Sequence, residues 1–158
     1  MNRKTQFLTQ SALVASLYIA LTYVSALLGL ASGMIQIRLS EMLTVLPAFS
    51  FSAVPGLFIG CFAANLLTGA PLWDVVFGSM ATLLGALGTY FFGQKKYFAP
   101  VFPILSNTII VPFVLKYVYG LNDACWLLAF TIFVGEFLSC GVMGMMLYKA
   151  IGKTGIFK

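Results

Sequence analysis

The stretch ACWLLAFTIFVGEFLSCGVMGMMLY, residues 124–148, places a single carboxylate, Glu136, between two runs of twelve uncharged and mostly apolar residues. These 25 residues are enough for a helix to span the hydrocarbon core of a bilayer. A carboxylate at that depth costs about 2.5–3.5 kcal/mol, so such residues usually face a bundle interior or a cavity and mark a substrate or ion path. The stretch therefore predicts a transmembrane helix with a functional acid at its centre.

The whole chain has the composition of an integral membrane protein. Its 158 residues are 61% hydrophobic and 8% charged, with a mean hydropathy of +1.00, whereas a soluble domain carries about 25% charged residues. Charge-free runs at 5–37, 42–73, 75–94 and 97–115 each approach or exceed the ~20 residues of a spanning helix. We expect one all-α transmembrane domain over residues 1–158, with the first run as a span and not a cleaved leader.

Several kinds of chemistry are not expected. Histidine is absent, and Cys61, Cys125 and Cys140 lie singly in apolar segments without metal-ligand spacing, so we expect packing cysteines, no disulfide and no metal. The sequence has no Gly-rich phosphate loop of the Walker type and no Ser/His/Asp set. We therefore expect neither an enzyme nor a cofactor, and we expect any ATP-hydrolysing subunit to be another chain.

The basic residues predict the topology. Seven of the nine fall at three places, and the positive-inside rule makes all three cytoplasmic: Arg3 and Lys4; Lys95 and Lys96; Lys149, Lys153 and Lys158. The number of spans between the first two places must then be even, so the run 42–73 crosses twice, broken near Pro47 and Pro55. This predicts six helices at about 8–30, 38–50, 53–68, 74–92, 97–119 and 124–150, with both termini cytoplasmic and Trp73, Tyr117, Tyr119 and Trp126 in an outer aromatic belt.

On this topology the remaining charges and two amides fall in the outer half of the bundle. The candidate substrate-binding residues are Glu136, Asn107, Asn65, Asp74, Arg38 and Glu41, with Trp73 and Phe77 as a stacking face joined by Phe137. Lys116 and Asp123 flank an outer turn and are expected to be solvated or snorkelling charges. Carboxylates, a guanidinium and amides suit a small polar ligand such as a purine-like lactam, whose two adjacent N–H donors one carboxylate can accept. Glu136 is the expected reader of that donor edge.

Other roles stay open for these residues. Glu136 could pair with Arg38 or relay protons, and Arg38 and Glu41 are one helical turn apart and could form a simple ion pair. Asp74 could serve its own helix as an N-terminal acid, and the two asparagines could join helices to each other.

The first helix carries a second candidate surface. Its small residues are Ser11, Ala12, Ala15, Ser16 and Ala20, which repeat at a spacing of four. Such spacing lets another helix approach closely, either within the bundle or from a partner membrane subunit.

Several segments together resemble a known family: IRLSE at 37–41, TVLP at 44–47, PGLFIGC at 55–61, ANLL at 64–67, DVVFGS at 74–79 and GE at 135–136. The chain is similar to the QueT family of substrate-binding S-components of energy-coupling factor (ECF) transporters. The resemblance implies a six-helix S-component in a prokaryotic plasma membrane that captures a 7-deazaguanine queuosine precursor, such as the aminomethyl form, from outside. It also implies docking through the small residues of the first helix onto a transmembrane coupling subunit served by two cytoplasmic ATPases, without a nucleic-acid partner.

The resemblance assigns Glu136 to the donor edge of the deazaguanine and Asp74 or Glu41 to the aminomethyl cation. The alternatives are an S-component for biotin, riboflavin or a thiamine precursor, a stand-alone carrier with Glu136 as its proton site, and a membrane scaffold without a ligand.

Overall fold

The computed structural model describes residues 2–31, 35–95, 97–118, 120 and 124–154, and every regular element in this part of the chain is helical. The elements are α1 (Arg3–Leu27), η1 (Leu39–Ala48), α2 (Ala53–Leu67), α3 (Leu72–Phe92), α4 (Val101–Tyr117), α5 (Cys125–Glu136), η2 (Phe137–Met143) and α6 (Gly144–Thr154). The last three run on as one helix, Cys125–Thr154. The described residues therefore make six helical passes, of which the second is a 3₁₀-helix and the last contains a π-helical segment. Lys96, Asp123, Tyr119 and Lys158 lie outside the described residues.

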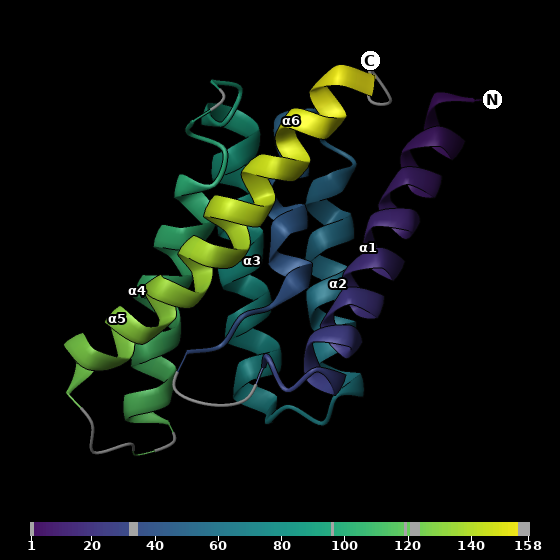
Figure 1. Ribbon diagram of the computed structural model, residues 1–158. Coiled ribbons are helices and arrows are strands. Elements are labelled where there is room, and N and C mark those ends of the chain that lie inside the picture. The colour runs from purple at the N-terminus through teal and green to yellow at the C-terminus, as the bar shows by residue number, and fades with distance from the viewer. Residues whose placement is uncertain (1, 32–34, 96, 119, 121–123, 155–158) are drawn as a thin grey trace.

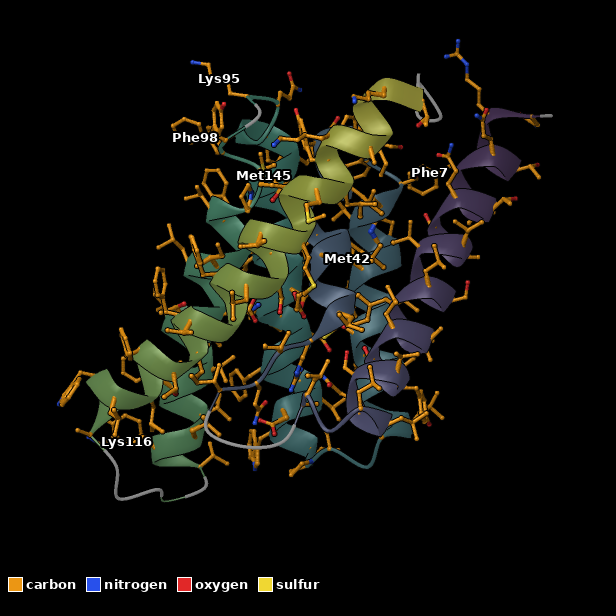
Figure 2. All side chains as sticks on the ribbon, in the orientation of Figure 1. Phe7, Met42, Lys95, Phe98, Lys116 and Met145 are labelled. Atoms are coloured by element: carbon orange, nitrogen blue, oxygen red, sulfur yellow. The ribbon has the colours of Figure 1, made fainter. Side chains whose placement is uncertain are left out.

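The passes alternate in direction along one bundle (Figure 1). The start of α1 and the end of α6 lie at the same end, which we call the terminal end (Figure 1). Lys95 lies at the terminal end and Lys116 at the opposite end (Figure 2). The break predicted at 50–52 falls between η1 and α2. The described members of the three basic groups are thus gathered at one end, as an even number of passes between them requires.

Three of the described helices are long and apolar enough to cross a membrane by length and composition: α1, α3 and Cys125–Thr154. The other three, η1, α2 and α4, are apolar but have 10–17 residues. The outside of the bundle is apolar as well, since large side chains on four of the six passes are more than half exposed: Leu8, Leu66, Phe91, Trp126 and Met146. An apolar exterior of this extent belongs in lipid. The all-helical membrane class is confirmed, and the crossing of the bilayer by all six passes stays a prediction.

Two helices differ in their bounds from the prediction because of local backbone chemistry. α1 ends at Leu27, short of residue 30, where Gly29 adopts a φ of 70° that L-residues rarely take. α4 begins at Val101 and not at residue 97, directly after Pro100, because proline is favoured at helix starts and disfavours helix in the residue before it.

The short second pass, η1, occupies the middle of the bundle. It contacts α1, α2, α3, α6 and η2, and seven of its ten residues are buried: Ser40, Glu41, Leu43, Thr44, Val45, Leu46 and Pro47. A 3₁₀-helix rises about 2.0 Å per residue against 1.5 Å for an α-helix, so ten residues reach about 20 Å. The tighter winding lets this short segment extend polar residues deep into the bundle; Figure 2 shows Met42, the neighbour of Glu41, at mid-height.

The small residues of α1 separate into two rows. Ser11 and Ala15 are buried against Gly56 and Gly60 of α2, where a Cβ on Gly60 would lie 2.8 Å from the Tyr18 Cβ. The Ser11 hydroxyl also donates to the Ser52 carbonyl at 2.8 Å. Ser11 and Ala15 thus serve internal packing, which removes them from the predicted docking face. The other row is exposed and consists of Ala12, Ser16 and Ala20.

Candidate functional site

A cavity lies between η1, α2, α3, α4 and α5 in the half of the bundle away from the terminal end. Its lining consists of Gln36, Arg38, Glu41, Cys61, Asp74, Gly78, Thr82, Asn107, Val111, Val114, Ile132 and Glu136. Its volume is about 60 Å³, and it is partly open to the surroundings; a typical small-molecule site has about 300–1,000 Å³. Charged and amide side chains from four helices and the segment before η1 therefore converge on one cavity.

Glu41 is the most deeply placed acid of this cavity, with 2% of its surface exposed. The Tyr18 hydroxyl donates a hydrogen bond to Oε1 of Glu41. Oε2 of the same carboxylate is buried and has no hydrogen-bond partner among the described residues. One carboxylate oxygen of Glu41 is therefore hydrogen-bonded, and the other has no hydrogen bond to the described residues.

Polar side chains on one face of α1 hold the start of η1. Besides Tyr18, the Thr22 hydroxyl donates to the Ser40 hydroxyl at 2.9 Å, and the Ser25 hydroxyl accepts from the Leu39 backbone N–H at 2.8 Å. These α1 positions share a face because they follow one another at spacings of four and three. The α1 helix therefore fixes both the backbone and the carboxylate of the η1 segment.

Glu136 is half-buried at the junction where α5 passes into the π-helical segment η2. π-helical turns inside α-helices occur frequently at functional sites. The Cys140 thiol donates to Glu136 Oε2 at 3.1 Å and also lies 3.4 Å from the Glu41 carbonyl oxygen. The Asn107 amide interacts with the same Glu136 carboxylate. Cys140 is fully buried, as expected of a packing residue, and its thiol in addition joins the helices that carry the two acids.

Arg38 and Asp74 are the other charged groups of the lining. Arg38 is half-buried, its backbone N–H donates to the Ser139 hydroxyl at 3.2 Å, and its guanidinium interacts electrostatically with Glu41 and Glu136. Asp74 is half-buried in the first turn of α3, where the helix dipole favours an acid.

Three of the predicted site residues do not line the cavity. Asn65 is buried, and its amide lies 3.4 Å from the Asp74 carbonyl oxygen and 3.5 Å from Cys61 Sγ, so it joins α2 to α3. Trp73 and Phe77 are exposed and stack on each other, with ring centroids 5.8 Å apart. Trp73 lies in the first turn of α3, at the end opposite the terminal end, the position of an interfacial aromatic residue. Neither ring forms a wall of the cavity in this structure.

Five predicted residues do line the cavity: Glu136, Asn107, Asp74, Arg38 and Glu41. Sequence reasoning missed seven others: Gln36, Cys61, Gly78, Thr82, Val111, Val114 and Ile132. Gly78 and Thr82 follow Asp74 at spacings of four and so share its helix face, which could have predicted them as lining residues. The apolar members gave no signal, because they resemble the lipid-facing residues around them.

Glu41, Glu136 and Cys140 each offer a ligand atom, and these atoms lie within 4.8 Å of one another. Carboxylates and thiolates are ligands that divalent metals accept. The sequence spacing could not indicate this group, because Glu41 lies on a different pass from the other two. The neighbouring Arg38 guanidinium is a donor only and cannot serve as a metal ligand.

An apolar exterior around a cavity lined by acids, an arginine and an amide defines a membrane protein that binds a small polar solute. The chain matches the QueT transporter family over residues 8–153. It is 32% identical over 167 residues to the queuosine precursor transporter QueT of Lactococcus lactis subsp. cremoris (strain MG1363), with 95% of this chain and 94% of that protein covered. No solved structure matches it. The chain belongs to the QueT transporter family, which confirms the resemblance seen in its sequence motifs.

Proposed function

We propose that this chain is the substrate-binding subunit of an ECF-type importer and that its cavity captures a 7-deazaguanine queuosine precursor. The observation that carries this proposal is the convergence of Glu136, Glu41, Asp74, Arg38 and Asn107 on one cavity within an apolar helical bundle. The name of the Lactococcus lactis relative supports the same substrate class.

The hydrogen-bonding chemistry of the cavity matches that of a deazaguanine. The lactam N–H and the amino group of the ligand are adjacent donors, which a single ionised carboxylate accepts in two parallel bonds. Glu136 faces the cavity and is assigned to this edge. Asn107, beside Glu136, can donate to or accept from the neighbouring ligand atoms, and Arg38 supplies donors for the ligand carbonyl.

The orientation of the chain follows from its basic residues. We assign the terminal end, which carries Arg3, Lys95 and Lys149, to the cytoplasm of a prokaryotic cell, and the cavity to the outer half of the plasma membrane. The exposed row Ala12, Ser16 and Ala20 on α1 is assigned to a transmembrane coupling subunit, because small side chains let a partner helix approach closely. Two cytoplasmic ATPase subunits supply the energy.

The substrate class is tested by identifying the ligand that the purified protein carries. Protein isolated from cells supplied with aminomethyl-deazaguanine is expected to release that base, detected by native mass spectrometry of the complex and by mass analysis of the released small molecule. Protein from cells without the base serves as the control. Release of biotin, riboflavin or a thiamine precursor from both preparations would contradict the assigned substrate.

The partner assignment is tested by uptake into liposomes. Uptake of the base is expected only when the coupling subunit, the two ATPases and ATP are present. Ser16→Leu is expected to lower this uptake at least about tenfold while ligand binding stays unchanged, because a large side chain on the exposed row keeps a partner helix away. Val76→Phe, at an exposed position on α3, is the matched control and is expected to transport normally.

Two outcomes would contradict the partner assignment. Uptake by this chain alone, driven by a proton gradient, would identify a stand-alone carrier in which Glu136 moves protons. Normal ATP-driven uptake by the Ser16→Leu protein would show that the exposed row on α1 is not the docking face.

A further inference from the structure

The Glu41 carboxylate has one oxygen that the described residues leave without a hydrogen bond. This oxygen, Oε2, is buried, and the whole residue is 2% exposed. A buried acceptor without a donor loses its hydration and gains nothing in return, and the loss is larger for a charged group than for a neutral one. Oε2 is therefore an acceptor position whose donor must come from outside the described chain.

The surroundings of Glu41 hold its carboxylate in place. The Tyr18 hydroxyl, itself 1% exposed, donates to Oε1. The Thr44 hydroxyl donates to the Glu41 backbone carbonyl at 2.6 Å, and Ser25 holds the Leu39 N–H two residues earlier. A carboxylate fixed on one oxygen and on its backbone presents the second oxygen in a constant direction, and Glu41 lines the cavity.

The charges of the described lining residues do not balance. The acids are Glu41, Asp74 and Glu136, and the single base is Arg38, which interacts with both Glu41 and Glu136. One guanidinium offsets one carboxylate, so ionisation of all three acids would leave a surplus of two negative charges in a low-dielectric space. A ligand that carries a positive charge would reduce this surplus, whereas a neutral ligand would leave it unchanged.

The three acids differ in whether they already have partners. Asp74 is half-buried at the start of α3 and is stabilised by the helix dipole and by its exposure. Glu136 meets the Cys140 thiol and the Asn107 amide. Only Glu41, among these described acids, combines nearly complete burial with an unpaired oxygen, so the geometry separates it from Asp74 as the acceptor for a cationic group.

We propose that Glu41 determines the specificity of the cavity by accepting the ammonium group of a cationic ligand at Oε2, with Tyr18 as its positioning residue. The inference rests on the proposed function, because the rest of the ligand is taken to be a deazaguanine read by Glu136. It goes further in selecting, among the precursors, the aminomethyl form, which is a cation, over the cyano form, which is neutral. The two ligands share the lactam and amino edge and differ only in this substituent.

The test measures the affinity of both ligands for three proteins by isothermal titration calorimetry, with EDTA present so that no metal ion can bridge the acids. Wild-type protein is expected to bind aminomethyl-deazaguanine at least about tenfold more tightly than cyano-deazaguanine, since a hydrogen bond between charged groups is worth a factor of this size. Glu41→Gln is expected to remove this preference by weakening the aminomethyl ligand alone. Glu136→Gln, the matched control, is expected to weaken both ligands alike.

Three other results would contradict either the inference about Glu41 or the proposed function. Equal affinity of wild-type protein for the two ligands, or tighter binding of the cyano form, would overturn the inference. This test needs only wild-type protein, so it can be made even if Glu41→Gln does not fold. Equal weakening of both ligands by Glu41→Gln would assign Glu41 to the shared edge and would also overturn it. Binding of neither ligand by wild-type protein would instead overturn the proposed function.

Discussion

Glu136→Gln is expected to lower the affinity for a deazaguanine at least about tenfold. A carboxylate accepts from both donors of the lactam edge, whereas a glutamine amide offers one accepting oxygen and places its own N–H donors against those of the ligand. Hydrogen bonds to charged groups contribute about 1.5–3 kcal/mol each, and 1.4 kcal/mol corresponds to a factor of ten in the dissociation constant. Losing one such bond is therefore enough to produce the expected effect.

The measurement is calorimetric titration of purified protein, accompanied by the thermal unfolding temperature without ligand. The ligand-free variant is expected to unfold no earlier than wild-type protein, because a neutral amide costs less than a carboxylate within a membrane bundle. Weaker binding at unchanged stability would therefore report on ligand recognition. Unchanged affinity would remove Glu136 from the ligand edge and leave the structural role or the proton path.

Gly135→Ala is expected to destabilise the protein and to weaken ligand binding at least about tenfold. A Cβ at Gly135 would overlap the backbone carbonyl oxygen of Gln36 and lie 3.2 Å from the Gln36 carbonyl carbon. Backbone atoms cannot turn aside as a flexible side chain can, so the segment that carries Gln36 and Arg38 must move away from α5. Overpacking of this kind costs about 1–3 kcal/mol. Because both residues line the cavity, the shift also displaces the Arg38 guanidinium from Glu41 and Glu136.

Gly141→Ala provides the matched control on the same continuous helix. A Cβ at Gly141 would meet only the Phe137 side chain, at 3.4 Å or more. Alanine is favoured over glycine in helices by about 1 kcal/mol, so this variant is expected to be as stable as wild-type protein or slightly more so. Thermal unfolding and calorimetry of the two variants separate the effects. Similar behaviour of both would show that the contact between Gln36 and Gly135 does not position the cavity wall.

Much of the fold could be predicted from local properties of the sequence. The charge-free runs predicted the approximate places of the helical passes, and the basic groups predicted both the number of passes and the common end of α1 and α6. The break at 50–52 followed from Pro47 and Pro55. The 3₁₀ form of η1 was not predicted; the start of η1 is held by hydrogen bonds with Tyr18, Thr22 and Ser25, which lie on another helix.

The candidate site was predictable in its charged members and in Asn107, whereas Gln36 and the apolar members were missed. Arg38, Glu41, Asp74, Asn107 and Glu136 stand out because polar groups are rare and expensive in a membrane span. Cys140 did not stand out, since a thiol is equally at home among packing residues. Trp73 and Phe77 were assigned to the ligand because aromatic rings suit stacking, but their exposed positions fit the membrane surface.

The sequence by itself determined the class of protein, the order of the helical passes and the common end of the described basic residues. These properties can be read from the sequence because a helix needs about 20 apolar residues to cross a bilayer, so the lengths of the apolar runs indicate where each pass begins and ends. Tertiary structure alone decided which way each side chain faces: Ser11 toward α2, Ser16 outward, and Oε2 of Glu41 without a hydrogen-bond partner among the described residues. In a membrane helix both the lipid face and the packed face are apolar, so the sequence has little periodicity from which to identify the inner face.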